Sequence, residues 1–229
     1  MRRIIGFIGL VLLFTNCVTL FHSARVLEPG ETETGGSFTL AGMSTQDYEN
    51  ILGNERNFIE FRAPSTPPIG LFVRNGWRDG LNTGAYLGLP FIDFFVTKRI
   101  VAESGKLPSV AITTDFSITW VLIHGEYAAG ASLDLFKSRY EGNDNINPFL
   151  RIRGGYKLWS TADIMSGYSY SGHLPVVGLT IGNEMKVTET SFIIAAASVE
   201  FMYGKQSWAE GPLSFELNLD FTLSRRSQR

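Results

Sequence analysis

Apolar and polar residues alternate along three long segments of the chain, and this alternation predicts β-strands with two unlike faces. It is clearest over 213–223, where leucine or phenylalanine fills every second position and polar or acidic residues lie between them. The segments 110–122 and 146–158 follow the same two-residue period. A helix would scatter these apolar side chains around its axis, because its period is about 3.6 residues.

Weaker alternation predicts seven further strands, and turn-forming residues such as Asp79-Gly80, Ser104-Gly105 and Gly211-Pro212 separate them. Their ranges are about 35–43, 68–76, 80–88, 91–101, 126–137, 174–184 and 190–203. The segments between strands at 44–67, 159–173 and 204–211 are predicted to be loops at one end of the molecule. The sequence therefore predicts an all-β fold, an antiparallel up-and-down transmembrane β-barrel of about ten strands, within a range of roughly 8–12.

Three features favour a membrane barrel over a soluble one. The clearest strands exceed ten residues, and a tilted membrane strand needs about 9–11. Charged residues make up 18% of the chain, against about 25% in soluble domains. Trp77, Trp120, Tyr156 and Trp159 fall near predicted strand ends, where aromatic girdles meet the membrane surface. The alternative is a soluble, lipid-anchored periplasmic barrel whose apolar face turns inward to bind an apolar ligand.

The N-terminus has the pattern of a secretory signal peptide: Arg2 and Arg3 precede an apolar run over 4–14. The only cysteine, Cys17, follows this run and resembles the lipobox of bacterial lipoproteins, although Phe14 and Asn16 depart from the usual residues. The resemblance implies a diacylglycerol on Cys17 that anchors the chain. The alternatives are signal cleavage near Ala24 and removal of Cys17 with the signal.

The predicted order is therefore a signal peptide over 1–17, a linker over 18–34, the barrel over 35–224 and a basic tail over 225–229. The stretch ARVLEPGE at 24–31 and the stretch VRNGWRDGLNTG at 73–84 resemble parts of uncharacterised bacterial, spirochaete-like outer-membrane β-barrel proteins. That resemblance implies an outer-membrane location, with outer-membrane lipid and the barrel assembly machinery as partners. Many such barrels end on an aromatic residue that this machinery reads, whereas here Phe221 is followed by a polar and basic end.

Charged side chains on the polar strand faces are the candidate functional residues. They are Arg151, Arg153, Lys157, Asp115, Glu126, Asp134, Glu216 and Asp220. One interpretation is a small solute pore that selects by charge. The other is a set of internal ion pairs, which we favour because side chains about fill a barrel of this size. The favoured prediction is a narrow, filled lumen and a structural, anchoring or surface-exposed role.

The sequence offers no catalytic or metal-binding pattern. His124 and His173 are predicted in loops and His22 near the processing site, so no nucleophile and base can be paired and we expect no enzyme. The acidic stretch 141–145 could bind calcium but is predicted to be a polar turn, and no metal or cofactor is expected. The net charge of −2 gives no indication of nucleic acid. An external ligand, if any, is expected at loops 44–67 and 159–173.

Overall fold

The computed structural model consists of β-strands arranged in one antiparallel sheet. It describes residues 22–51, 54–62, 69–89, 91–121, 124–138, 145–162, 169–203 and 213–228. The strands are β1 (Glu31–Ile51), β2 (Asn54–Arg62), β3 (Ile69–Gly76), β4 (Leu81–Leu89), β5 (Phe91–Val101), β6 (Ser109–Val121), β7 (His124–Phe136), β8 (Ile146–Ala162), β9 (Ser169–Lys186), β10 (Ser191–Tyr203) and β11 (Leu213–Gln228). A single 3-10 turn, η1 (Arg78–Gly80), is the only helix among these residues. None of the described segments forms a helix long and apolar enough to cross a membrane.

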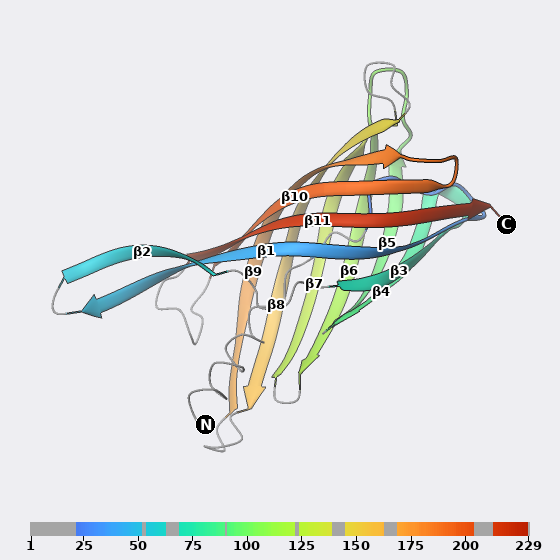
Figure 1. Cartoon of the computed structure of the whole chain (residues 1–229). Helices are drawn as coiled ribbons and strands as arrows, with labels where there is room; N and C mark the ends of the chain where they lie inside the picture. The colour runs from blue at the N-terminus through green and yellow to red at the C-terminus, as the bar shows by residue number, and fades with distance from the viewer. Residues whose placement is uncertain are drawn as a thin grey trace.

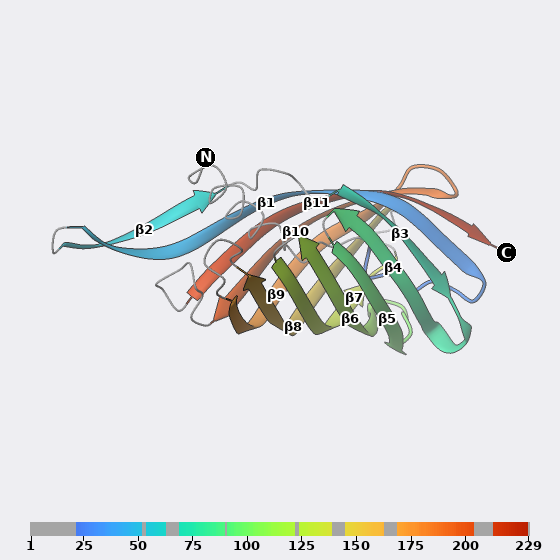
Figure 2. The ribbon, with the colours of Figure 1, turned by 90° about the horizontal axis from the view of Figure 1, so that it is seen from below.

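The sheet closes into a ring because β1 pairs with β11, from Glu31 opposite Gln228 to Thr45 opposite Ser214. The ring contains ten strands, β1 and β3 to β11, and each is antiparallel to its neighbours. Strand β2 lies in line with β3 along β1, where Arg62 pairs with Met43 and Ile69 pairs with Phe38. Figures 1 and 2 show the tilted strands and the wall that β5 to β9 form across the barrel from β1 and β11. The predicted ten-stranded antiparallel barrel is confirmed.

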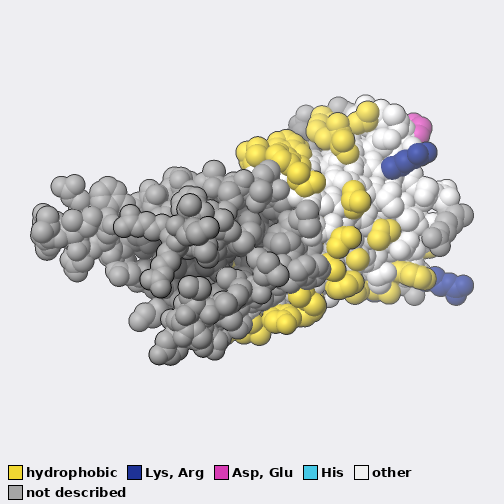
Figure 3. Space-filling view, turned by 60° about the horizontal axis from the view of Figure 1, so that its bottom comes forward, with side chains coloured by type: hydrophobic (Ala, Val, Ile, Leu, Met, Phe, Trp, Pro, Cys, Tyr) yellow, Lys and Arg dark blue, Asp and Glu magenta, His cyan; other side chains and the backbone are white. Residues whose placement is uncertain are grey.

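The alternation predicted from the sequence sorts side chains between the outside and the inside of this ring. On β11, Leu219 and Phe221 are exposed by 48% and 45%, whereas Asp220 between them is 1% exposed. Ile152 and Arg151 on β8 divide in the same way. Figure 3 shows hydrophobic side chains over the described part of one outer face, with Lys and Arg side chains near the right-hand end. The soluble alternative required the reverse arrangement and is excluded.

An apolar exterior on a closed ring is the arrangement that a bilayer demands. Closure pairs the backbone groups of neighbouring strands, and the hydrocarbon layer offers no water to replace those bonds. The polar side chains face inward, away from the acyl chains. The fold is therefore that of a membrane-spanning β-barrel.

Two predicted loops are largely strand. Strand β1 runs to Ile51 and β2 occupies 54–62, so the predicted loop 44–67 is mostly a hairpin, which extends past the barrel in Figure 1. Strands β8 and β9 likewise fill most of 159–173, and they place His173 in β9, while His124 begins β7. The prediction was wrong because a ribbon outside the hydrocarbon layer needs no apolar face and therefore shows no alternation. The residues 204–211 and 141–144 lie outside the described chain.

The ends of the barrel also differ from the prediction. Strand β1 begins at Glu31, within the predicted linker, and β11 continues to Gln228 through the predicted basic tail. The alternation persists there, since Arg225 is exposed and Arg226 is buried with its charge paired. A run of charges suggested a solvated tail, but Arg226 takes an inward position of the strand. The predicted signal peptide and Cys17 precede the described residues.

Aromatic rings lie flat against glycines inside the barrel. Phe72, Tyr86 and Phe95 are each at most 4% exposed. A methyl group added to Gly84 would overlap the Phe95 ring, and one added to Gly70 would overlap Tyr86. Glycine is needed at these inward positions because it leaves room for a neighbouring ring. Phe149 covers Gly182 in the same way.

Candidate functional site: two ion-pair layers and an N-terminal segment inside the barrel

The first feature of the interior is a layer of charges between wall strands, which we name the middle layer. Its members are Asp93, Asp115, Asp134, Arg151, Arg153 and Glu200. Arg151 binds Asp134 through two hydrogen bonds, 2.7 Å from Nε to Oδ1 and 3.1 Å from Nη2 to Oδ2. The hydroxyl of Thr113 also donates to Asp134, at 2.6 Å. This two-pronged geometry holds both partners in fixed orientations.

Arg153 links two acids on opposite sides of its own strand. Its guanidinium binds Asp115 on β6 and lies 3.3 Å from Glu200 on β10. Glycine occupies the strand that each contact must cross: the arginine lies over Gly130 of β7, and Glu200 lies over Gly178 of β9. A larger residue at either position would block the contact. The linked ion pairs of Asp115, Arg153 and Glu200 therefore span five adjacent strands, β6 to β10.

The middle layer contains more acids than arginines. Asp93 is 8% exposed on β5, and the register places it diagonally beside Asp115. Together the described members comprise four carboxyl groups and two guanidinium groups. Charge inside this part of the lumen is therefore negative when all members are ionised.

The structure brings together four of the predicted lumen charges, Asp115, Asp134, Arg151 and Arg153. Asp220 also points inward and accepts a hydrogen bond from Thr39 at 2.6 Å. The side chains of Glu126, Lys157 and Glu216 lie outside the described part of the structure. Sequence reasoning missed Asp93 and Glu200, although both occupy alternate positions on strands that it did identify.

A second layer, the termini-end layer, lies where both ends of the barrel chain meet. Its members are Glu33, Arg74, Glu184 and Arg226. Arg74 donates to Glu33 at 2.5 Å, and Arg226 donates to Glu184 at 3.0 Å. Arg226 also lies 3.3 Å from Glu33, which links the two pairs. Two acids and two arginines balance one another, and the guanidinium of Arg226 stacks 3.8 Å above the Phe192 ring.

The chain before β1 enters the lumen at this layer, and we name residues 22–28 the N-terminal segment. Arg74 donates to the backbone oxygens of Arg25 and Ser23, at 2.7 and 3.3 Å. The hydroxyl of Ser23 donates to Glu184 at 2.5 Å. The predicted linker is therefore partly a packed element, a feature that no alternation could reveal in so short a stretch.

The N-terminal segment also makes apolar contacts with the barrel interior. Ala24 is 2% exposed and belongs to a buried cluster with Phe136, Phe149, Ile194 and Ala196. The His22 ring stacks on Phe95 with 4.3 Å between centroids. His22 was predicted to lie near a processing site, and the structure instead buries it in the barrel.

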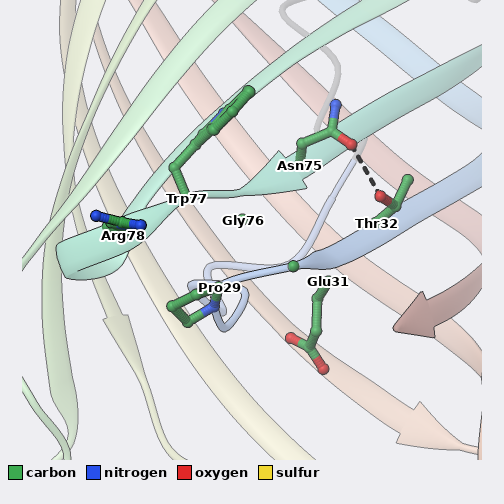
Figure 4. A pocket seen from close by; sticks show the side chains of 8 residues that line it. Pro29, Glu31, Thr32, Asn75, Gly76, Trp77 and Arg78 are labelled. Atoms are coloured by element: carbon green, nitrogen blue, oxygen red, sulfur yellow. Dashed lines mark hydrogen bonds between the residues drawn. The ribbon is translucent and has the colours of Figure 1, made fainter. Parts of the chain in front are cut away.

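The rim at the termini end carries a shallow cavity of about 350 Å³ between the start of β1 and the β3–β4 turn. Figure 4 shows its lining from Pro29 to Thr32 on one side and from Asn75 to Arg78 on the other. The Thr32 hydroxyl donates to Asn75 at 2.9 Å, and the Trp77 indole donates to Thr83 at 2.8 Å. Trp77 is 54% exposed at a strand end, which suits an aromatic girdle. The side chains of Trp120 and Trp159 are not described.

Ion pairs dominate the described interior. Among the described residues, no three His, Cys, Asp or Glu side chains come close enough to hold a metal ion. Each arginine in the two layers is matched to a carboxylate on another strand.

No protein-family model matches the sequence, and no curated protein matches it. Solved structures align along the barrel. One is Ail, the attachment invasion locus protein of Yersinia pestis, at 12% identity over 87% of this chain and 99% of that chain, with a TM-score of 0.39. Others are the outer membrane protease OmpT of Escherichia coli, at 8% identity over 89% and 99% with a TM-score of 0.40, and the NanC porin, at 9% over 84% and 99% with 0.42. Likeness at this level carries no argument about activity, and the assignment of the barrel depends on the strand pairing and the two faces described above.

Proposed function

We propose that this protein is a closed outer-membrane anchor, which presents its long hairpins outside the cell and does not conduct solutes. The observation that carries the proposal is the occupied lumen: the N-terminal segment contacts β3, β5, β9 and the apolar cluster of β7, β8 and β10 at the termini end, and the middle layer lines the wall from β6 to β10. Removing one partner of a buried ion pair costs about 3–5 kcal/mol. Moving Arg153 away from its acids would cost about that much, so the middle layer should stay fixed against the wall rather than open and close as a gate.

The orientation follows from the even number of strands. Both ends of the ring lie at one end of the barrel, where Glu31 pairs with Gln228. We assign this end to the periplasm, where the assembly machinery delivers the chain. The β1–β2 and β8–β9 hairpins then extend outside, and residues 44–62 and 159–173 are the proposed contact region for an external ligand.

Conductance across a planar lipid bilayer tests the closed state. The purified wild-type protein should give no steady channel steps, whereas an open porin in the same lipid should give them. Reproducible steps from the wild-type protein would overturn the proposal. An epitope inserted at residues 52–53, between β1 and β2, should bind antibody on intact cells if the hairpin is outside.

The second candidate is a narrow solute pore, and one observation favours it. The middle layer has four acids for two arginines, so its charge is negative when all its members are ionised. A pore with this lining would prefer cations. Conductance with cation selectivity in the wild-type protein would favour this candidate over the closed anchor.

Lipid attachment at Cys17 remains a further proposal. Cys17 lies five positions before His22, and five residue-to-residue steps span at most about 18 Å. An acyl anchor would therefore be confined to the neighbourhood of the barrel. Mass spectrometry of the mature protein should show a diacylglycerol that is absent in Cys17→Ser. An N-terminus after residue 17 without lipid would contradict the proposal.

A further inference from the structure

The barrel holds the N-terminal segment through its backbone and the small side chains of Ser23 and Ala24, and it also buries the side chains of His22, Val26 and Leu27. Arg74 binds two backbone oxygens, those of Ser23 and Arg25. Glu184 accepts from the Ser23 hydroxyl, and the methyl group of Ala24 packs in an apolar cluster. Backbone oxygens are common to every peptide, so these contacts select a peptide by the small residue that it carries at the position of Ala24.

The wall is complete without this segment. Strand β1 begins at Glu31, and its pairing with β11 extends from that residue onward. The acid and the arginine that hold the segment keep other partners, since Arg74 pairs with Glu33 and Glu184 pairs with Arg226. Withdrawal of the segment therefore leaves no uncompensated charge in the termini-end layer.

We propose that the termini-end mouth of the barrel is a peptide-binding site, which residues 22–28 occupy in cis and which takes an external peptide of the same pattern once they leave. This proposal rests on the proposed closed state of the barrel, because it identifies residues 22–28 as the segment that closes the termini end. Its pattern is a hydroxyl residue followed by alanine, with freedom at the next position. Arg25 supports that freedom, because its side chain is 29% exposed and its two acidic neighbours are at long range, Glu31 at 3.8 Å and Glu184 at 3.9 Å.

The site should select peptides by the size of the residue at the position of Ala24. Phe136 and Phe149 border the methyl group, and both rings are 4% exposed. Interiors of this density do not admit an indole without displacement of their neighbours. A peptide with tryptophan at the position of Ala24 should therefore be excluded, whereas glutamine at the position of Arg25 should be tolerated.

The experiment removes the N-terminal segment from the termini end and leaves the barrel strands unchanged. A site-specific protease sequence inserted between Pro29 and Gly30, which are exposed, allows the folded protein to be cut and its released segment washed away in detergent. Fluorescence anisotropy then follows a labelled peptide with the sequence of residues 22–28. Binding should saturate, the Ala24→Trp peptide should bind at least tenfold more weakly, and the Arg25→Gln peptide should bind within about threefold of the original.

Each outcome decides the question. If the cut segment stays in place, exchange against an excess of labelled peptide replaces the wash, and absence of both release and exchange overturns the proposal. Equal binding of the original and Ala24→Trp peptides also overturns it, as does absence of binding to a cut barrel that retains its heat-modifiable gel mobility. Conductance of the uncut protein tests the closed anchor separately, whatever the peptides do.

Discussion

The two ion-pair layers use the same side-chain chemistry to hold different things. In the middle layer, Arg153 joins β8 to β6 and β10, and its acids have few other partners. In the termini-end layer, Arg74 and Glu184 are already matched within the wall and hold the N-terminal segment as well. An ion pair alone therefore does not say whether a contact is permanent. What matters is how many partners a charged side chain keeps when one contact is lost: Arg74 and Glu184 keep partners in the wall when the N-terminal segment leaves, so the segment can be exchanged.

The largest expected loss of stability follows from removing a charge of the middle layer. Arg153→Met leaves Asp115 and Glu200 without their shared cation, and the free energy of unfolding should fall by about 3–5 kcal/mol. Urea unfolding in lipid vesicles, followed by tryptophan fluorescence, measures the change. Lys106→Met, at an exposed turn residue, is the control and should stay within about 0.5 kcal/mol of wild type. An equal loss in both variants would contradict the assigned role of Arg153.

A somewhat smaller effect is expected where rings cover glycines. Gly84→Ala places a methyl group against the Phe95 ring and should lower the free energy of unfolding by about 1–3 kcal/mol. Gly154→Ala is the matched control, because a methyl group there meets open space on the outer face, and it should be neutral. The same unfolding experiment compares them, and a neutral Gly84→Ala would show that the ring can move aside.

A substitution in the N-terminal segment should release the segment and leave the barrel wall largely intact. Ala24→Trp in the full chain should expel the N-terminal segment, and trypsin should then cleave after Arg25 at least tenfold faster than in wild type. The unfolding of the wall should change by less than in Arg153→Met, because the paired charges remain. Arg25 as well protected as in wild type would mean that the cluster around Ala24 accepts an indole.

The smallest effect concerns a rim contact between the β5–β6 and β7–β8 turns. Burial opposes ionisation of Glu103, but hydrogen bonds from Lys137 and Ser138 outweigh it and hold the pKa of the carboxyl below 4.5. A lowered pKa in the folded state stabilises the protein above about pH 4.5, and that contribution is lost as the pH falls through the folded pKa. Glu103→Gln should cost about 0.2–1 kcal/mol at neutral pH and less at pH 3. Urea titrations at both pH values test this, and an equal cost at both would contradict it.

The sequence predicted the parts of the fold that the bilayer dictates. Leu219 and Ile152 alternate with inward residues because lipid lies on one side and a polar lumen on the other, so their strands could be recognised. The β1–β2 hairpin was missed because residues outside the hydrocarbon layer are free of that constraint. Its polar run over 44–51 therefore read as a loop.

The candidate site was predicted only in part, for a related reason. Asp134 and Arg151 stood out as charges on polar faces, but nothing in the sequence says which residues face one another on neighbouring strands. The N-terminal segment has no period to detect. Its one signal is Val26-Leu27, an apolar pair directly before a Pro-Gly turn, which suggests burial ahead of the first strand.

The central claim is that apolar side chains face lipid while their neighbours fill the lumen. Single cysteines at Asn218, Leu219, Asp220, Phe221, Thr222 and Leu223 in a Cys17→Ser background, each carrying a fluorophore, test it most directly in vesicles that contain nitroxide lipids. The account predicts strong quenching at 219, 221 and 223, with weak quenching at 218, 220 and 222. Quenching without this two-residue period, or with the opposite phase, would contradict the account.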